Sequence, residues 1–294
     1  MKNIFITGST GFVGKNIIKY FNTKFEFYRF SRGEEININQ DIVLHFAGKA
    51  HDLKNTSKIQ DYYDINTELS KNIFDAFLES NAKLFITLSS VKAVADELDR
   101  ELTEEFTPNP ITHYGKSKLL AEQYILNKEI PKEKRVYILR PCMIHGHGNK
   151  GNINLLYNFV RKGFPWPLGS FKNKRSFCSI INLCFIINEL IENDQISSGI
   201  YNVADDEPLS TNKIIELISI SLNRKVIIWN TPQFILKTIA KIGDLLKLPM
   251  NTERLHKLTD SYVVNNSKIK NAINKQLPLT SINGMKKTIE SFIL

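Results

Sequence analysis

The sequence predicts an α/β protein with a Rossmann-like, doubly wound parallel sheet and a smaller α/β lobe. Short apolar runs typical of buried strands alternate with amphipathic helical patterns through the first half of the 294-residue chain. A glycine-rich turn follows the first run, and the alternation fades after Pro141. Because strands that alternate with helices are joined by right-handed crossovers, this pattern builds a parallel sheet.

The elements of the sheet follow one another from the N-terminus. The expected strands are residues 2–7, 25–30, 41–48, 83–90 and 135–141, with a brief extended segment at 36–39. The expected helices are 12–22, 61–80 and 114–127. In the first helix Val13, Ile17 and Phe21 share one face, and Lys15 and Lys19 lie on the other.

The second half of the chain is less regular. The expected elements are loops at 146–152 and 163–170, an apolar helix at 176–193, a strand at 199–205 and a helix that begins at the capping residues 210–212. Residues 234–248 form an amphipathic helix with Lys237, Lys241 and Lys247 interleaved. We expect it to pack on the lobe; the alternative is weak association with a membrane surface.

Composition narrows the functional class. A hydrophobic content of 42% and a charged content of 23% are typical of soluble globular proteins. The net charge of +9 is dispersed rather than collected in a tail, which disfavours nucleic acid and suits an anionic small molecule. Cys142, Cys178 and Cys184 lack metal-ligand spacing, so we expect buried thiols in a reducing compartment and no metal site. With no signal peptide and no integral membrane segment, the sequence predicts a cytoplasmic protein.

Gly8, Gly11 and Gly14 lie between the first strand and the first helix, in TGSTGFVG. Glycines permit a tight turn and a close approach of a pyrophosphate, and a helix N-terminus offers N–H groups to it. The sequence therefore predicts a dinucleotide-binding domain at 1–148. A substrate-binding lobe follows at 149–294, interleaved with the first because 176–205 returns to the sheet.

The choice of dinucleotide is read at the end of the second strand. Ser31 and Arg32 stand there, and a hydroxyl with a guanidinium suits a 2′-phosphate, so NADP(H) is favoured. NAD(H) stays open because arginine also stacks on adenine. Glu34 and Glu35 follow a glycine and are expected to lie out of position.

Tyr114 and Lys118 stand four residues apart in HYGKSK. At this spacing two side chains share one face of a helix, and an ammonium beside a phenol lowers the pKa of the phenol from about 10. Such a pair donates and accepts protons near neutral pH. The alternative is a chance pair on a surface helix.

Five segments occur together in order: TGSTGFVG, HFAGKAH, a strand ending in LSS, YGKSK and LRPCMIHGHG. By these segments the chain resembles the extended short-chain dehydrogenase/reductase family, also called the NAD-dependent epimerase/dehydratase family. The resemblance implies catalysis by Tyr114, Lys118 and Ser90, with Ser89 as the neighbouring possibility. The implied cofactor-binding residues are Gly8, Gly11, Phe12, Val13, Gly14, Ser31, Arg32, Phe46, Ala47, Gly48, Tyr114, Lys118 and Pro141. His45 and His51 are expected to be structural.

The second half resembles the nucleotide-sugar branch of that family, which implies substrate contacts from Ser90, Asn152 and Arg175. For Arg175 the alternative is a solvated basic loop. The segments SSVKAV, KGNINLL and WPLGSFKNKRSF are similar to those of carbon-4 reductases of UDP-2-acetamido-2,6-dideoxy-4-keto-hexoses. That resemblance implies NAD(P)H-dependent reduction of the 4-keto group of a UDP-linked 6-deoxy-N-acetylhexosamine, for bacterial surface polysaccharide.

The alternative within the family is a UDP-sugar 4-epimerase with tightly bound NAD. A dehydratase is disfavoured because Val91 and Lys92 stand where that class has Asp-Glu. A redox sensor without turnover is disfavoured because the catalytic residue types are all present. The resemblance also implies a homodimer paired through 61–80 and 114–127, and the configuration of the product at carbon 4 stays open.

Overall fold

The computed structural model describes residues 2–49, 58–149, 151–248 and 251–293, and it confirms the predicted doubly wound parallel sheet. Six strands pair in the order β2-β1-β3-β4-β5-β8, all parallel. They are β1 (Asn3–Thr7), β2 (Glu26–Arg29), β3 (Ile42–His45), β4 (Leu84–Leu88), β5 (Arg135–Pro141) and β8 (Gly199–Val203). The chain adds β2 on one side of β1 and the later strands on the other, so the winding reverses between β1 and β3.

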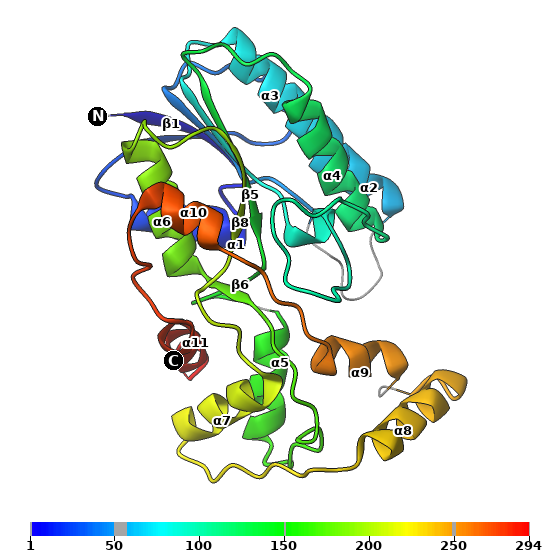
Figure 1. The fold of residues 1–294 in the computed structure, drawn as a ribbon. Coiled ribbons are helices and arrows are strands. Elements are labelled where there is room, and N and C mark those ends of the chain that lie inside the picture. The colour runs from blue at the N-terminus through cyan, green and yellow to red at the C-terminus, as the bar shows by residue number, and fades with distance from the viewer. Residues whose placement is uncertain (1, 50–57, 150, 249–250, 294) are drawn as a thin grey trace.

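Helices cover both faces of the sheet (Figure 1). One face carries α1 (Phe12–Tyr20), α6 (Ile180–Glu192) and α10 (Ser267–Ile273). The other carries α2 (Ile59–Tyr63), the π-helical turn η1 (Asp64–Glu68), α3 (Leu69–Glu79) and α4 (His113–Leu126). Because side chains of a strand alternate between faces, Ile4 and Ile6 join the core beneath α1 and α6, while Phe5 joins the core beneath α3 and α4.

The connection from β2 to β3 crosses the sheet without a helix. Phe30 and Ile38 are buried and pack in the same core as Phe5, so this connection passes over the α3 face. The extended segment expected at 36–39 is not a strand, because Ile38 packs on the face of the sheet rather than pairing at its edge.

The smaller lobe has a core of its own. Its helices are α5 (Asn152–Arg161), α7 (Thr211–Ser221), α8 (Gln233–Leu245), α9 (Thr252–Thr259) and α11 (Ser281–Glu290), with a small sheet of β6 (Met143–His145) and β7 (Phe177–Ser179). The helix expected at 176–193 begins only at Ile180, because the preceding residues pair with β6 as β7. The division into domains at residue 148 stays a prediction.

Two expectations from composition can be compared with the described residues. Among them, no helix is both long and apolar enough to cross a bilayer. Cys142, Cys178 and Cys184 are buried free thiols, as expected. Burial raises the pKa of each thiol, so these cysteines pack as small apolar side chains.

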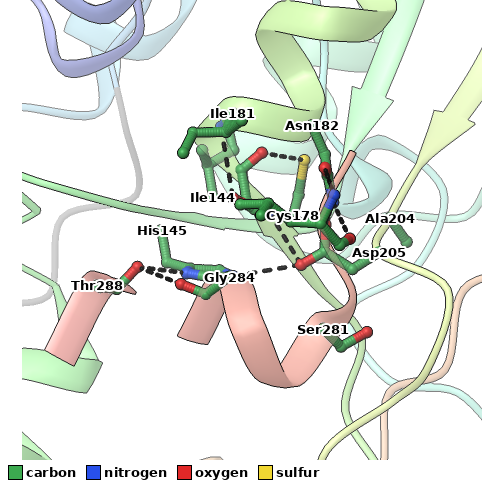
Figure 2. Close-up of polar contacts among 12 residues, drawn as sticks. Ile144, His145, Cys178, Ile181, Asn182, Ala204, Asp205, Ser281, Gly284 and Thr288 are labelled. Carbon is green, nitrogen blue, oxygen red and sulfur yellow. Dashed lines mark hydrogen bonds and ion pairs between the residues drawn. The ribbon is translucent and has the colours of Figure 1, made fainter. Parts of the chain in front are cut away.

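A buried polar cluster fastens α11 to the sheets (Figure 2). His145 on β6 hydrogen-bonds Thr288 on α11 through Nδ1 (2.8 Å) and Asp205 through Nε2 (3.3 Å). The Asp205 carboxylate also accepts hydrogen bonds from Ser179 N (2.9 Å) and Asn182 Nδ2 (2.7 Å). Since the His145 and Asp205 side chains are both 0% exposed, the cluster is structural, although it contains the residue types of a hydrolase triad.

We expect Asp205→Ala to lower the free energy of unfolding by about 3 kcal/mol, because it leaves buried donors without their acceptor. The exposed Asp194 provides the matched control, and Asp194→Ala should change the free energy by less than about 0.5 kcal/mol. Urea denaturation of the three proteins measures both values. Equal effects of the two substitutions would contradict a structural role for the cluster.

Candidate active site

The predicted cofactor and catalytic residues follow strands that end side by side. Thr7 of β1 pairs with His45 of β3, and His45 pairs with Thr87 of β4. Open α/β sheets bind ligands at this carboxyl edge, next to the point where the winding reverses. Phe12 and Val13 open α1, Phe46, Ala47 and Gly48 follow β3, and Pro141 ends β5, so the predicted residues share one edge.

The turn after β1 is shaped for the close approach of a ligand to the backbone. Gly8 has a φ of +69°, and a Cβ there would lie 2.5 Å from Ala47 N. A Cβ at Gly14 would collide with the Gly8 carbonyl. Helix α1 follows Gly11 with no side-chain cap and no acidic residue in its first turn. The first N–H groups of α1 therefore suit an anion, and the turn fits a dinucleotide diphosphate.

Gly8→Ala should weaken binding of NAD or NADP by more than about tenfold, or ~1.4 kcal/mol, because the added methyl displaces the segment after β3. Gly163 is the matched control: it also has a positive φ (+80°), but a Cβ there meets only an ordinary contact at 3.6 Å. Titration of cofactor fluorescence measures both variants. Equal weakening by the two substitutions would show that backbone strain alone, and not this turn, sets the affinity.

His45 is structural, as expected from the sequence, and joins three elements. Its Nδ1 hydrogen-bonds Thr7 Oγ1 (2.8 Å) and its Nε2 hydrogen-bonds Ser70 Oγ (2.8 Å). Burial lowers the pKa of His45 to about 3, and the charge of Lys118 adds to the lowering. The imidazole is therefore neutral and holds β1, β3 and α3 together. His51 lies outside the described residues.

The low pKa of His45 predicts a contribution to acid sensitivity. Its pKa is about 3 in the folded protein and ~6.5 in the unfolded chain. Between these values the unfolded chain binds more protons, so the stability is complete above pH ~6.5 and falls as the pH decreases toward ~3. His45→Asn should reduce the slope of unfolding free energy against pH in this window. An unchanged slope in urea titrations would show that His45 does not titrate on unfolding.

The end of β2 corrects one expectation about the cofactor. Ser31 and Arg32 are exposed there, as the sequence suggested. Glu34, however, is not out of position: its carboxylate folds back and accepts a hydrogen bond from Ser31 N (2.9 Å). The turn at Gly33, with a φ of +95°, makes this reversal possible. An acid therefore lies beside the backbone of Ser31 at the end of β2.

Ser90 and Tyr114 meet beyond the end of β4. Their side chains are hydrogen-bonded to each other, and Ser90 Oγ also accepts a hydrogen bond from Lys92 N (3.2 Å). The neighbouring Ser89 Oγ is buried and has no hydrogen-bond partner among the described residues. The contact with the phenol supports Ser90 rather than Ser89 as the catalytic serine.

Lys118 lies one turn after Tyr114 on α4 and is buried. Its ammonium donates to the Leu88 carbonyl (2.8 Å) at the end of β4. It also lies beside Gly48, where a Cβ would come within 3.1 Å of Nζ. Burial lowers the pKa of Lys118 to about 8, against the opposing charge of Glu122.

The expected lowering of the Tyr114 pKa by Lys118 does not hold in this structure. Burial raises the pKa of the phenol, and the hydrogen bond from Ser90 opposes that rise. Burial penalises the charged form of both groups, and the ammonium is directed at a backbone carbonyl. At neutral pH Tyr114 is therefore a neutral phenol, which is the form that donates a proton.

Asn66 is a residue of this corner that the sequence did not single out. Its Oδ1 accepts a hydrogen bond from Lys49 N (2.8 Å), and its Nδ2 donates to Ser117 Oγ (3.0 Å). These bonds tie the segment after β3 to α4. Asn66 reaches both because it lies in the π-helical turn η1, and such bulges are frequent at functional sites. No periodicity in the sequence marks this turn.

In the smaller lobe Arg175 is held by backbone and side-chain hydrogen bonds. It does not lie in a solvated basic loop, which was the alternative left open by the sequence. Its backbone forms bridges to Leu209 and Tyr262, and its guanidinium donates to the Lys257 carbonyl on α9. Burial lowers the pKa of Arg175. Asn152, the other predicted substrate residue, is the half-buried first residue of α5.

Lys92 is a second residue that the sequence did not single out. Its Nζ donates to the Asp96 carbonyl (2.5 Å) and lies 4.2 Å from the centre of the Tyr262 ring. Burial lowers the pKa of Lys92 to about 8, and the charge of Arg175 adds to the lowering. Two neighbouring, partly buried cations suit an anionic ligand, and Asp96 beside Lys92 and Asp260 beside Arg175 offset part of their charge.

Comparison with known proteins agrees with the motifs. Residues 31–204 match the NAD dependent epimerase/dehydratase family. The chain is 28% identical to a UDP-glucose 4-epimerase of Vibrio cholerae, covering 99% of this chain and 96% of that protein. It is 27% identical to an N-acetyl-alpha-D-glucosaminyl-diphospho-ditrans,octacis-undecaprenol 4-epimerase of Escherichia coli O157:H7, covering 76% and 73%. Both relatives are 4-epimerases, which favours the epimerase alternative over the reductase expected from the sequence.

A solved structure shows the same fold. The UDP-glucuronic acid 4-epimerase from Bacillus cereus in complex with NAD matches with a TM-score of 0.75 and 17% identity, covering 99% of this chain and 98% of that one. Relatives named as a dehydrogenase and as a reductase also occur. With more than half of its residues in the family match and a turn that fits a dinucleotide, the chain belongs to the NAD-dependent epimerase/dehydratase family of nucleotide-sugar enzymes.

Proposed function

We propose that the chain is a UDP-sugar 4-epimerase with tightly bound NAD. The observation that carries the proposal is that the Ser90–Tyr114 pair and the Lys118 ammonium lie at the same sheet edge as the glycine turn. Similarity to a UDP-glucose 4-epimerase along 99% of the chain supports this reaction. When bound, the dinucleotide supplies the hydride acceptor and donor for carbon 4 of the sugar.

Tyr114 is the residue placed to exchange a proton with the oxygen on that carbon. Ser90 contacts the phenol and would hydrogen-bond the same oxygen. As a neutral phenol Tyr114 can protonate a 4-keto oxygen, whereas deprotonating a 4-hydroxyl requires the phenolate. Lys118, with a pKa of about 8, is positively charged below that pH. In this structure its ammonium is bonded to the Leu88 carbonyl, so it would have to turn toward Tyr114 to stabilise the phenolate during that step.

The end of β2 supports NAD rather than NADP as the cofactor in this proposal. Because the Glu34 carboxylate lies at Ser31 N, it is placed to accept hydrogen bonds from ribose hydroxyls and would repel a 2′-phosphate. Arg175 and Lys92 would contact the diphosphate of the UDP-sugar, since arginine binds phosphate in a bidentate manner and lysine as a point charge.

A carbon-4 reductase of a UDP-linked 6-deoxy-N-acetylhexosamine, using NADPH, is the second candidate. Ser31 and Arg32 support it, because both are exposed at the end of β2 and suit a 2′-phosphate. The two candidates differ in the fate of the reducing equivalent: an epimerase returns it to the sugar, and a reductase consumes NADPH.

One experiment separates these reactions. The purified protein is denatured and its supernatant is assayed for released NAD. The intact protein is then incubated without added reductant with UDP-glucose and with UDP-N-acetylglucosamine, and the products are read by NMR. Epimerisation at carbon 4 with co-purified NAD supports the proposal. Stoichiometric oxidation of NADPH by UDP-4-keto-6-deoxy-N-acetylglucosamine, with no epimerisation, would replace it by the reductase.

A homodimer paired through α2–α3 and α4 remains part of the proposal. Ile59, Leu120 and Leu126 on these helices are large apolar residues that are 54%, 44% and 52% exposed. A second copy would cover them. Light scattering after size exclusion tests the dimer, and Leu120→Asp should shift the mass toward the monomer.

A further inference from the structure

The outward face of α8 is an apolar stripe. Ile235, Ile239, Ile242 and Leu246 are spaced by four, three and four residues, so they lie in one row along the helix. Their exposed fractions are 38%, 47%, 48% and 60%. Solitary exposed hydrophobic residues are ordinary, whereas a contiguous row marks an interaction surface.

A different face of α8, about a quarter turn around the helix from the stripe, is the one that packs. Leu236, Ala240 and Gly243 are its buried residues, and α9 packs against this helix. Two of these three residues, Ala240 and Gly243, have the smallest side chains of all amino acids. The larger apolar side chains thus face outward, and Phe234 and Leu245 at the two ends of the helix are 71% and 82% exposed. Folding of this chain alone leaves the stripe residues of α8 partly exposed.

The basic side chains of α8 lie away from the stripe. Lys237 and Lys241 are one turn apart on the side of α8 that faces away from the row, and Lys247 follows the end of the helix. The acidic residue of the helix, Asp244, is occupied: its carboxylate accepts hydrogen bonds from the backbone N (3.0 Å) and the hydroxyl of Thr252. The surface therefore combines exposed apolar side chains with exposed lysines.

We propose that α8 docks on the surface of an anionic phospholipid bilayer, lying in the headgroup region parallel to the membrane. Apolar residues would enter the boundary between headgroups and acyl chains, and the lysines on the polar side of the helix would stay at the level of the headgroups. The charge favours this partner over a second copy of the chain, because an anionic surface attracts the lysines of α8, whereas pairing α8 with a second α8 brings like charges close together. This inference does not depend on the reaction catalysed.

The position of α8 in the fold is compatible with docking. Helix α8 lies at the outer end of the smaller lobe, with α9 between it and the sheet (Figure 1). Helix α9 lies between α8 and the Arg175 side chain, whose guanidinium donates to the Lys257 carbonyl. A bilayer contact through α8 therefore leaves the carboxyl edge of the sheet uncovered and brings the lobe side of the site toward the membrane.

The test is flotation of the full chain with vesicles. Vesicles of phosphatidylglycerol and phosphatidylcholine are compared with vesicles of phosphatidylcholine alone, each at low and at high salt. We expect binding to the anionic vesicles that weakens with salt. Ile239→Asp/Ile242→Asp and Lys237→Glu/Lys241→Glu should each reduce the bound fraction at least about tenfold. Because these side chains are exposed, both variants should keep the wild-type Tm.

Two control variants carry the same types of substitution at exposed residues outside α8. Leu155→Asp/Ile220→Asp changes two apolar residues of the same lobe that are each 63% exposed, and Lys15→Glu/Lys19→Glu changes two exposed lysines one turn apart on α1. Both should float like the wild type. Three results would overturn the proposal: no binding to anionic vesicles at low salt, an equal loss in the controls, or a change of oligomeric mass caused by the α8 substitutions, which would mean that another copy covers this face.

Discussion

Tyr114→Phe should reduce kcat by about 10³-fold, within the range of 10² to 10⁴ typical for loss of a general acid or base. The substitution removes one oxygen from a half-buried side chain, and the ring can keep its contact with Tyr62, whose centroid lies 6.2 Å away. Folding and cofactor binding should therefore be preserved. Single-turnover rates with a UDP-sugar, together with cofactor content, measure the effect.

Tyr124→Phe is the matched control on the same helix. The Tyr124 hydroxyl donates to Asp75 (2.5 Å), so its loss costs some stability but leaves the chemistry unchanged. Turnover of Tyr114→Phe within about threefold of wild type would refute the proton-transfer role of Tyr114, because loss of a general acid or base costs at least ~10²-fold. The same deficit in both variants would indicate a general effect on α4.

Arg140→Met should lower the free energy of unfolding by about 3–5 kcal/mol, because it leaves a buried carboxylate without its counter-charge. Arg140 at the end of β5 and Glu122 on α4 form an ion pair of 2.5 Å between Nη2 and Oε2, with the side chains 3% and 2% exposed. A second bond joins Nε to Oε1 at 3.0 Å. Glu122 follows Lys118 by one turn, so the pair also helps to hold the Lys118 segment of α4 against the sheet.

Two further variants isolate the buried charge as the cause. Arg140→Met/Glu122→Leu should recover most of the lost stability, since an apolar pair replaces an ion pair without an unpaired charge. Lys213→Met removes half of the surface pair with Glu216, in which the side chains are 43% and 39% exposed, and should cost less than about 1 kcal/mol. Chemical denaturation measures the free energy of unfolding of Arg140→Met, of the double variant and of Lys213→Met. If Arg140→Met costs no more than Lys213→Met, the pair does not hold α4 in place.

Local patterns in the sequence account for most of the sheet. The strands at 2–7, 83–90 and 135–141 were found because apolar runs and helical periodicity are properties of neighbouring residues. The glycine turn was found for the same reason, since backbone freedom at Gly8 depends on that residue alone. Helices α9, α10 and α11 were not anticipated; they are short, and α11 is anchored through contacts such as the one from Thr288 to His145.

The direction of long side chains was not predictable. Lys118 was placed correctly on the helix face, but its ammonium is held by the Leu88 carbonyl, 30 residues away in the sequence. The Glu34 carboxylate turns back onto Ser31 because the chain reverses at Gly33. The presence of a glycine before Glu34 does not by itself reveal the direction of this turn. Both differences concern the site: the ammonium of Lys118 is bonded to a backbone carbonyl, and the carboxylate of Glu34 is bonded to the backbone at Ser31.

By itself, then, the sequence determined the order of strands and helices, the glycine turn and the residue types of the catalytic group, because each depends on spacing within a few residues. Only the tertiary structure decided which groups meet. Asn66 reaches Ser117 through a π-helical turn, and Arg140 neutralises Glu122 between a strand and a helix. These contacts depend on how distant segments pack and on the free-energy cost of burying a charge. Neither can be predicted from the spacing of residues along the chain.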